Sequence, residues 1–257
     1  MIQNYLKIAW RNLLRNKFFS MLNILGLALG MACSILILLW VQNELSIDDY
    51  HANSNRLFAV IERQYYDHKV VGQYATPGVL GAELKKVVPE IQYAVNTNIG
   101  YLSTFQVGNK ILKLEGGYAD ADVFKMFSYH LLAGSPQSAL NAPANIAISK
   151  KMAGEFYGSP QAAIGKTIKF QNKQNFTITA VFDDLPENSS TKFEYLINWD
   201  RFLKDNEWAK SWGNNGPQTY VMLRADANPA LVDKKITRFL DAYNKDQNAS
   251  FREELGL

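Results

Sequence analysis

The stretch Phe18–Asn43, FFSMLNILGLALGMACSILILLWVQN, decides how this chain is organised. It holds 26 residues and no charged side chain. As a helix rising about 1.5 Å per residue it reaches about 39 Å, which is enough to cross a hydrocarbon core of about 30 Å with some tilt. The stretch therefore predicts a membrane-spanning helix over residues 18–43.

The charges on either side of this stretch predict its orientation. Four basic residues and no acidic one precede it: Lys7, Arg11, Arg15 and Lys17. Acidic residues follow it, beginning with Glu44. Because positively charged flanks stay in the cytoplasm, we expect residues 1–17 inside and residues 44–257 outside, in the periplasm of a cell whose inner membrane holds the span.

A cleaved signal peptide is the competing interpretation of a basic start and an apolar stretch. Its apolar core measures about 7 to 15 residues and ends at small residues. The tetrapeptide ending at Cys33 resembles a lipoprotein processing site, but the apolar run continues to Val41. We therefore predict that the span is retained.

Small residues recur every fourth position within the span, at Gly26, Gly30 and Ser34. This spacing puts them on one face of a helix, where a second helix can approach closely. Glycine is frequent in spans in any case, so chance spacing is the alternative. The favoured interpretation is a helix-packing stripe.

Residues 1–17 have the pattern of an amphipathic helix lying on the cytoplasmic leaflet. The apolar residues lie on one face of this helix: Ile2, Leu6, Ala9 and Leu13. The basic residues lie on the opposite face: Lys7, Arg11 and Arg15. We expect the basic side chains, together with Lys17, to contact phosphates of the lipid bilayer rather than a protein.

The residues after the span are nearly neutral as a whole. Of the 27 lysines and arginines four precede the span, which leaves 23 against all 24 acidic residues. Nothing in this balance favours nucleic acid as a partner. The single cysteine, Cys33, lies in the span and excludes an intrachain disulfide.

Alternating strand and helix patterns after the span predict an α+β domain. The expected strands are 56–63, 104–107, 111–116, 146–148, 167–170, 176–182 and 218–223. The expected helices are 77–88, 122–126, 149–157 with Ser149 as its N-cap, 198–204 and 229–243.

The residues that could belong to an enzyme or cofactor motif do not have the spacing that the motif requires. Gly165-Lys166-Thr167 ends like a phosphate-binding loop, but six residues instead of four separate Gly158 from Gly165. The three histidines match neither zinc spacings nor a serine elbow, and we expect the acidic loop 183–190 to be a solvated turn. Trp199, Trp208 and Trp212 favour core packing over a ligand groove. We predict no catalytic, cofactor or metal site.

Several segments together resemble FtsX-like permeases of ABC transporters, which carry a MacB-like periplasmic core domain. In the N-terminal part these are residues 6–17, 23–31 and 44–51. Further along they are residues 120–127, 165–168, 177–181, 184–190 and 219–223. The resemblance covers nearly the whole chain.

The resemblance implies a division of labour between subunits. A separate cytoplasmic ABC ATPase would hydrolyse ATP, and the membrane helices would relay motion to the periplasmic domain for export or extraction. It also implies a second permease copy as a partner, a periplasmic adaptor as a further one, and a periplasmic domain of two α+β lobes.

Compared with the pattern of that family, residues 44–257 lack the final piece of the core domain, and no second span follows them. We therefore expect this chain to be the N-terminal part of a permease. The alternative is a complete single-pass binding or sensory module without transport activity. An anchored hydrolase is a third hypothesis, which no nucleophile and base support.

Overall fold

The computed structural model describes residues 2–66, 69–244 and 251–257, with the backbone alone for residues 2, 3, 6 and 251. Two compact units make up the chain, Met1–Asp49 and Tyr50–Leu257. We call them the first and the second unit and describe each by itself.

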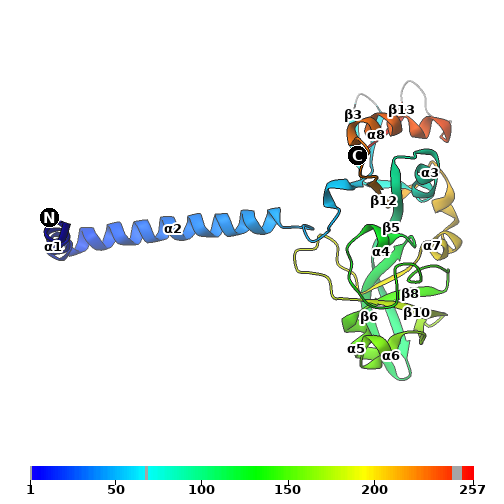
Figure 1. Cartoon of the computed structure of the whole chain (residues 1–257), viewed down its shortest axis with the longest axis horizontal. Coiled ribbons are helices and arrows are strands. Elements are labelled where there is room, and N and C mark those ends of the chain that lie inside the picture. The colour runs from blue at the N-terminus through cyan, green and yellow to red at the C-terminus, as the bar shows by residue number, and fades with distance from the viewer. Residues whose placement is uncertain (1, 67–68, 245–250) are drawn as a thin grey trace. The chain divides into compact units, whose positions relative to one another are not determined.

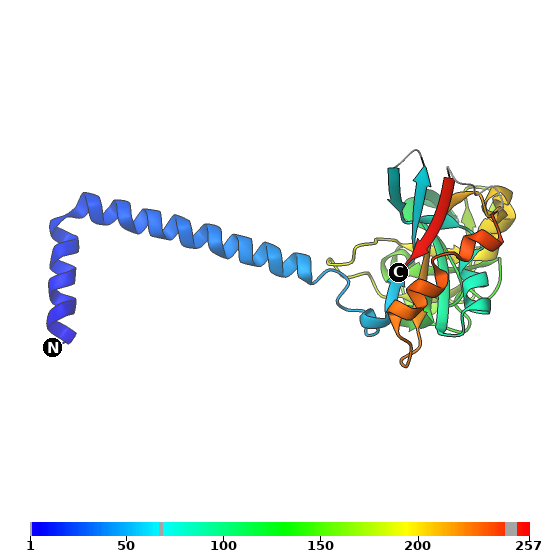
Figure 2. The ribbon, with the colours of Figure 1, turned by 90° about the horizontal axis from the view of Figure 1, so that it is seen from above.

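The first unit consists of helices α1 (Ile2–Arg15) and α2 (Lys17–Leu45). Among the described residues, α2 is the one helix long and apolar enough to cross a membrane, with a mean hydropathy of 2.6 over its most apolar window. The predicted span 18–43 lies inside it. Figure 2 shows α1 turning sharply away from the axis of α2 at their junction, next to Asn16.

The second unit is built on one large sheet and one small sheet (Figure 1). Its described residues place ten strands in the large sheet: β1 (Leu57–Ala59), β4 (Ala75–Pro77), β5 (Ile91–Val107), β6 (Lys110–Ala119), β7 (Leu131–Ala133), β8 (Asn145–Ser149), β9 (Thr167–Phe170), β10 (Gln174–Phe182), β11 (Tyr195–Asn198) and β12 (Asn215–Leu223). The small sheet has the order β13-β2-β3, with β2 (Ile61–Tyr66), β3 (Lys69–Gln73) and β13 (Phe251–Gly256).

Short helices cover the two sheets. They are α3 (Leu80–Val87), α4 (Val123–Met126), α5 (Lys150–Tyr157), α6 (Pro160–Ala163), α7 (Trp199–Asp205) and α8 (Pro229–Ile236), with 3₁₀ turns at Ser54–Arg56, Glu207–Lys210 and Phe239–Ala242. In Figure 1, α8 lies with β3 and β13 at one end of the unit, and α5 and α6 lie at the other.

Six strands of the large sheet close into a ring. The neighbours around it are β5, β6, β11, β8, β10 and β9, and β9 pairs back with β5. That last pairing joins Phe105 to Phe170 and Gln106 to Lys169. Phe105 and Phe170 pack with Tyr195 in a cluster of buried residues drawn from the ring strands and from α5 and α6.

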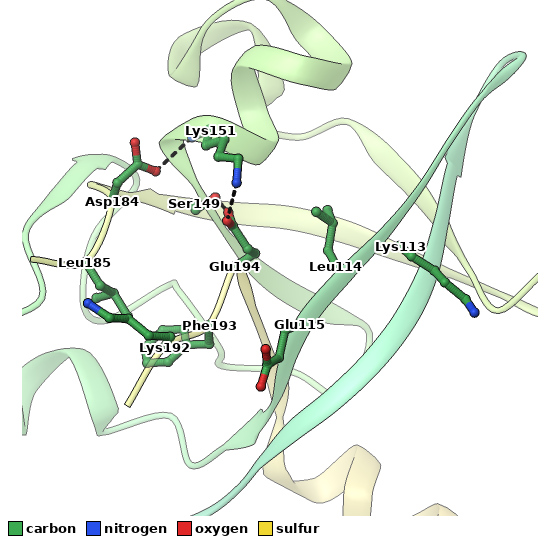
Figure 3. A pocket seen from close by; sticks show the side chains of 10 residues that line it. All are labelled: Lys113, Leu114, Glu115, Ser149, Lys151, Asp184, Leu185, Lys192, Phe193 and Glu194. Atoms are coloured by element: carbon green, nitrogen blue, oxygen red, sulfur yellow. Dashed lines mark hydrogen bonds and ion pairs between the residues drawn. The ribbon is translucent and has the colours of Figure 1, made fainter. Parts of the chain in front are cut away.

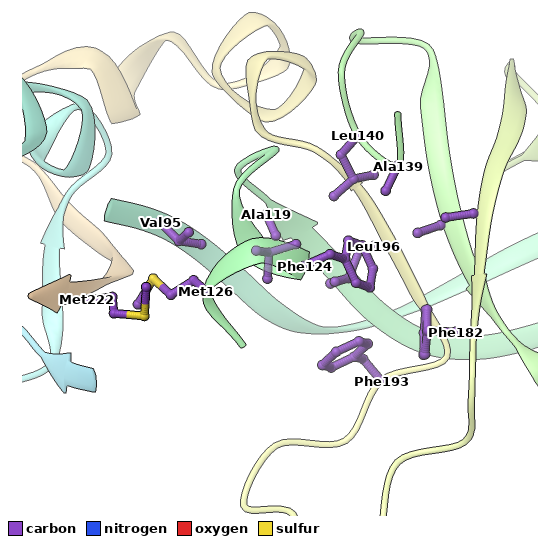
Figure 4. Packing of buried hydrophobic residues seen from close by; sticks show 13 residues of the cluster. Val95, Ala119, Phe124, Met126, Ala139, Leu140, Phe182, Phe193, Leu196 and Met222 are labelled. Carbon is purple, nitrogen blue, oxygen red and sulfur yellow. The ribbon is translucent and has the colours of Figure 1, made fainter. Parts of the chain in front are cut away.

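The hydrophobic core extends beyond this ring. A second cluster joins β10, β11 and α4 through Phe182, Leu196 and Phe124, as Figure 4 shows. A third lies under α3 and α8 and includes Leu255 of β13. The α+β fold expected from the sequence is confirmed. Residues 50–257, with both sheets, form one compact unit.

Two predicted elements differ from the structure. The strand expected over 56–63 is divided at Val60 between β1 in the large sheet and β2 in the small one, and the Val60 N–H donates to the Thr219 carbonyl. The helix expected over 229–243 ends at Ile236, because the Leu255 N–H takes the carbonyl of Thr237 that the next helical turn would use.

Candidate functional site

The packing stripe predicted for the span lies on one face of α2. Gly26, Gly30 and Ser34 are exposed within the first unit, and a Cβ atom added at either glycine would meet no atom within 4 Å. The Ser34 hydroxyl donates to the Gly30 carbonyl at 2.9 Å, which satisfies it inside the helix. This face has little side-chain volume at the two glycines and an internally satisfied hydroxyl at Ser34. Packing of a second helix against it stays a prediction.

The basic side chains of the first segment divide between the two helices. Lys7, Arg11 and Arg15 are exposed on one face of α1, while Lys17 is the first residue of α2. Lys17 also lines a cavity of about 350 Å³ that is otherwise formed mainly by apolar side chains of α1 and α2. Ile2 and Leu6, assigned to the apolar face, have side chains outside the described set.

The second unit begins with three residues held by hydrogen bonds to distant parts of the chain. We call residues 50–52 the latch segment. The Tyr50 hydroxyl lies 2.9 Å from the Ser189 hydroxyl. The Ser128 N–H donates to His51 Nδ1 at 3.2 Å, and the Ala52 N–H donates to the Ser128 hydroxyl at 2.9 Å.

Aromatic rings enclose His51, which is 7 % exposed. Its ring centroid lies 4.1 Å from that of Tyr50, 5.2 Å from Phe127 and 5.4 Å from Tyr129. Phe127 and Tyr129 pack in turn against the buried cluster that contains Phe124. At His51, six residues after the end of α2, the chain is therefore fixed in the hydrophobic core of the second unit.

A cavity of about 470 Å³ opens between the first turn of α5 and strand β6 (Figure 3). Hydrogen bonds connect four of the polar residues that line it: Ser149, Lys151, Asp184 and Glu194. Glu194 accepts hydrogen bonds from the Ser149 hydroxyl and from Lys151 Nζ, the latter at 3.0 Å, and the Lys151 N–H donates to Asp184 Oδ1. This pairing with Glu194 raises the pKa of Lys151. The Ser149 hydroxyl that donates to Glu194 also accepts from the Met152 N–H, so it caps the first turn of α5.

The rejected motifs have structural roles instead. Gly165 and Lys166 form a turn that leads into β9, with the Gly165 N–H donating to the Ile178 carbonyl, so no helix begins there to hold phosphate. Among the described residues, no group of three histidine, cysteine, aspartate or glutamate side chains could hold a metal.

The three tryptophans do not share one groove. Trp199 and Trp208 both contact Phe202, whereas Trp212 stacks on Tyr243 at a centroid distance of 4.1 Å.

The carboxyl groups missed at the sequence level include Glu62, which is fully buried, and Asp120, which is half-buried. Burial raises the pKa of Glu62 and of Asp120 to about 7 in each case. Asp120 accepts two hydrogen bonds from Asn96, at 2.6 Å from its backbone N–H and at 3.0 Å from its side-chain amide. Both residues lie in segments whose polar side chains suggest exposure to solvent. Nothing in the neighbouring sequence therefore predicts the raised pKa of either carboxyl group.

Comparison with known families decides the relationship. A profile of the MacB-like periplasmic core domain matches residues 20–239. The chain belongs to this family. The resemblance seen in the sequence is thereby confirmed. No curated protein matches the chain.

Solved structures of similar fold support this family. A domain described as a permease protein from Porphyromonas gingivalis is 21% identical, with a TM-score of 0.68 over 80% of this chain and 90% of that one. The periplasmic region of MacB from Actinobacillus actinomycetemcomitans is 14% identical, with a TM-score of 0.51 over 75% and 87%. The extracellular domain of the noncanonic ABC-type transporter YknZ from Gram-positive bacteria is 16% identical, with a TM-score of 0.50 over 76% and 98%. At these identities the likeness concerns the fold.

Proposed function

We propose that this chain is permease machinery of an ABC transporter, in which a separate cytoplasmic ATPase drives motion that α2 carries to the MacB-like core domain. The chain itself performs no catalysis in this proposal. Its domain moves substrate or an outer partner during export or extraction, and two permease copies work together in the inner membrane.

The charge distribution supports the orientation of this machine. The four basic residues before the apolar stretch favour the cytoplasmic side, where an ATPase works, and the family match favours the periplasm for the domain that follows. The basic face of α1 suits lipid phosphate, which would hold this helix at the membrane surface beside an ATPase.

The latch segment is the observation that carries the relay proposal. A displacement of the C-terminal end of α2 reaches the second unit through Ser46–Asp49, and the next residues are fixed. His51 is buried among rings, and Ala52 and Tyr50 are bonded to serines 76 and 139 positions away. A rigid attachment of this kind transmits displacement, whereas a flexible linker would absorb it.

Photo-cross-linking in native membranes tests the ATPase partner. A photoreactive amino acid replaces Asn12, an exposed residue of α1 beside its basic face, and Leu36 in the middle of the span serves as the matched control. We expect a cross-linked product containing an ABC ATPase from position 12 and none from position 36. Capture of lipid alone from both positions would contradict the proposal and favour a single-pass binding or sensory module.

The relay itself is tested with the captured ATPase and the full chain in lipid nanodiscs. Hydrogen exchange of the Ser128 amide is compared in ATP and in ADP, for wild type and for His51→Ala. We expect a nucleotide-dependent difference in wild type that is lost in the variant while ATP hydrolysis continues. Equal exchange in ATP and ADP for wild type would contradict the relay.

A further inference from the structure

Glu62 occupies the middle strand of the small sheet and is fully buried. One of its carboxyl oxygens, Oε1, accepts three N–H groups: from Gln64 at 2.8 Å, from Gln73 at 3.2 Å and from Asn215 at 2.7 Å. Gln64 and Gln73 belong to the small sheet, but Asn215 begins β12 of the large sheet. The bond to Asn215 therefore joins the two sheets.

The other oxygens of these two groups have no partner. Among the buried side-chain polar atoms of the described residues, two lack any hydrogen bond, and they are Glu62 Oε2 and Asn215 Oδ1. Both are acceptors when the carboxyl is ionised, so neither can satisfy the other. Leaving two buried acceptors unsatisfied costs free energy that a single shared donor would recover.

A proton on Glu62 Oε2 supplies that donor. The carboxylic acid then has one O–H to give and Asn215 Oδ1 has the lone pairs to accept it, while the amide N–H already donates to Oε1. The protonated acid and the amide would then be joined by two hydrogen bonds, and both unsatisfied atoms would gain a partner.

We propose that Glu62 is a proton-operated contact between the two sheets: protonated, it holds Asn215 by two hydrogen bonds, and ionised, it loosens the attachment of the small sheet to β12. The inference concerns the core domain itself and holds whether or not the relay proposal is correct.

The surroundings of Glu62 favour the neutral acid. Burial and, to a smaller extent, the nearby carboxyl group of Glu253 on β13 raise the pKa of Glu62 to about 7, against the lowering effect of the three amide donors. Lys69 of β3 lies on the same face of the small sheet but opposite Tyr66, at the far end of β2.

Other charged groups of the packed elements point away or are paired. Arg63, Arg252 and Glu254 alternate onto the opposite face of the small sheet, and β4 and β12 have no charged residue. The helices and turns packed against β12 and β13 supply charged residues that interact elsewhere: Lys85 with Asp122, Lys86 with Glu83, Glu207 with Lys210, Lys235 with Glu90, Arg238 with Asp241, and Asp233 with the Leu257 N–H, while Lys234 is exposed.

The direction of the pH effect follows from the raised pKa. The folded form retains its proton up to about pH 7, whereas the unfolded chain loses it near pH 4.5. The contribution of Glu62 to stability is therefore complete below pH 4.5 and is lost as the pH rises to about 7. This gap limits the total change in the unfolding equilibrium to roughly 300-fold.

The test compares the full chain in lipid nanodiscs with Glu62→Gln, whose amide copies the protonated acid by donating to Asn215 Oδ1. Hydrogen exchange of the β2 amides is measured at pH 5 and pH 8 and corrected for the intrinsic rate. We expect wild-type protection to fall at least tenfold at pH 8, and the variant to keep at pH 8 the protection that it has at pH 5.

Asp120→Asn is the matched control, because it neutralises another carboxyl of raised pKa that has no bond to the small sheet. It should leave the pH dependence of β2 exchange unchanged. Wild-type exchange that is independent of pH would overturn the proposal. Weaker protection in Glu62→Gln than in wild type at pH 8 would also overturn it, since a carboxylate bridged by water or a cation would then be the stabilising form.

An infrared measurement on wild type removes any dependence on how the variants fold. The C=O band of a protonated carboxylic acid, shifted by ¹³C-glutamate labelling, should be present at pH 5.5 and absent at pH 9. Burial also raises the pKa of Glu253, which contributes to the same band, so the absence of the band at pH 5.5 is the decisive outcome. Absence of the shifted band at pH 5.5 would refute a protonated Glu62.

Discussion

Replacing His51 with alanine should release the latch segment from the core. The substitution removes ring contacts with Tyr50, Phe127 and Tyr129 and the acceptor for the Ser128 N–H. The second unit keeps its sheets, because no strand includes residues 50–52. We therefore expect local opening rather than global unfolding.

The magnitude follows from those contacts. Three ring pairs contribute about 0.5–1.5 kcal/mol each beyond their area, and the hydrogen bond to Ser128 about 1 kcal/mol. Partial repacking around the cavity reduces the sum, so we expect a loss of about 3 kcal/mol. That corresponds to roughly 100-fold more opening of the segment.

Hydrogen exchange of two amides measures this opening. The Ser128 N–H donates to His51 and the Ala52 N–H donates to Ser128, so both should exchange about 100-fold faster in His51→Ala. His51→Phe is the control: it keeps a ring but not the acceptor, and it should accelerate Ser128 more than Ala52. If both amides keep their wild-type rates in His51→Ala, the latch segment is held by something other than His51 and our reasoning is wrong.

Two further substitutions test the span and the ring. Changing both Gly26 and Gly30 to Ile should leave membrane insertion intact and weaken helix association by about tenfold or more in a two-helix membrane assay; unchanged association would show that the stripe is not an interface. In Gly117→Ala the new Cβ would lie 2.1 Å from the Asn98 carbonyl oxygen. The paired strands must separate there, so we expect a loss of about 2–4 kcal/mol in thermal unfolding. Gly72→Ala adds a Cβ with nothing within 4 Å and should cost less than about 1 kcal/mol; equal effects would contradict the steric argument.

Local chemistry made part of the fold predictable. The charge-free stretch identified α2 because length and hydropathy are properties of the segment alone. The strands expected over 104–107 and 111–116 lie in β5 and β6, and Gly108 has a φ of +56° in the turn between them, a conformation that glycine adopts without strain. Ser149 accepts from the Met152 N–H as the expected N-cap of α5.

The remaining elements depend on partners far away in the sequence. Strand β13 pairs with β2 across more than 180 residues, so its short polar segment carried no strand signal of its own. Glu62 looks like an exposed position of an alternating strand, and only the placement of Asn215 and Glu253 around it creates the buried cluster. Leu231 lies in the segment expected to form one long helix over 229–243 and is 65% exposed, because α8 buries Val232 and Ile236 instead.

The closed ring of strands also determines the order in which the second unit can fold. Strands β5 and β6 are a local hairpin that can form as soon as both strands have been synthesised. Closure requires Phe105 to meet Phe170, a contact between residues far apart in the sequence, and the chain pays the loop-closure entropy before that contact stabilises it. Until β9 pairs with β5, the edge of β5 at Phe105 and Gln106 lacks that partner strand. The interval between hairpin formation and ring closure is therefore when the second unit is most exposed to aggregation.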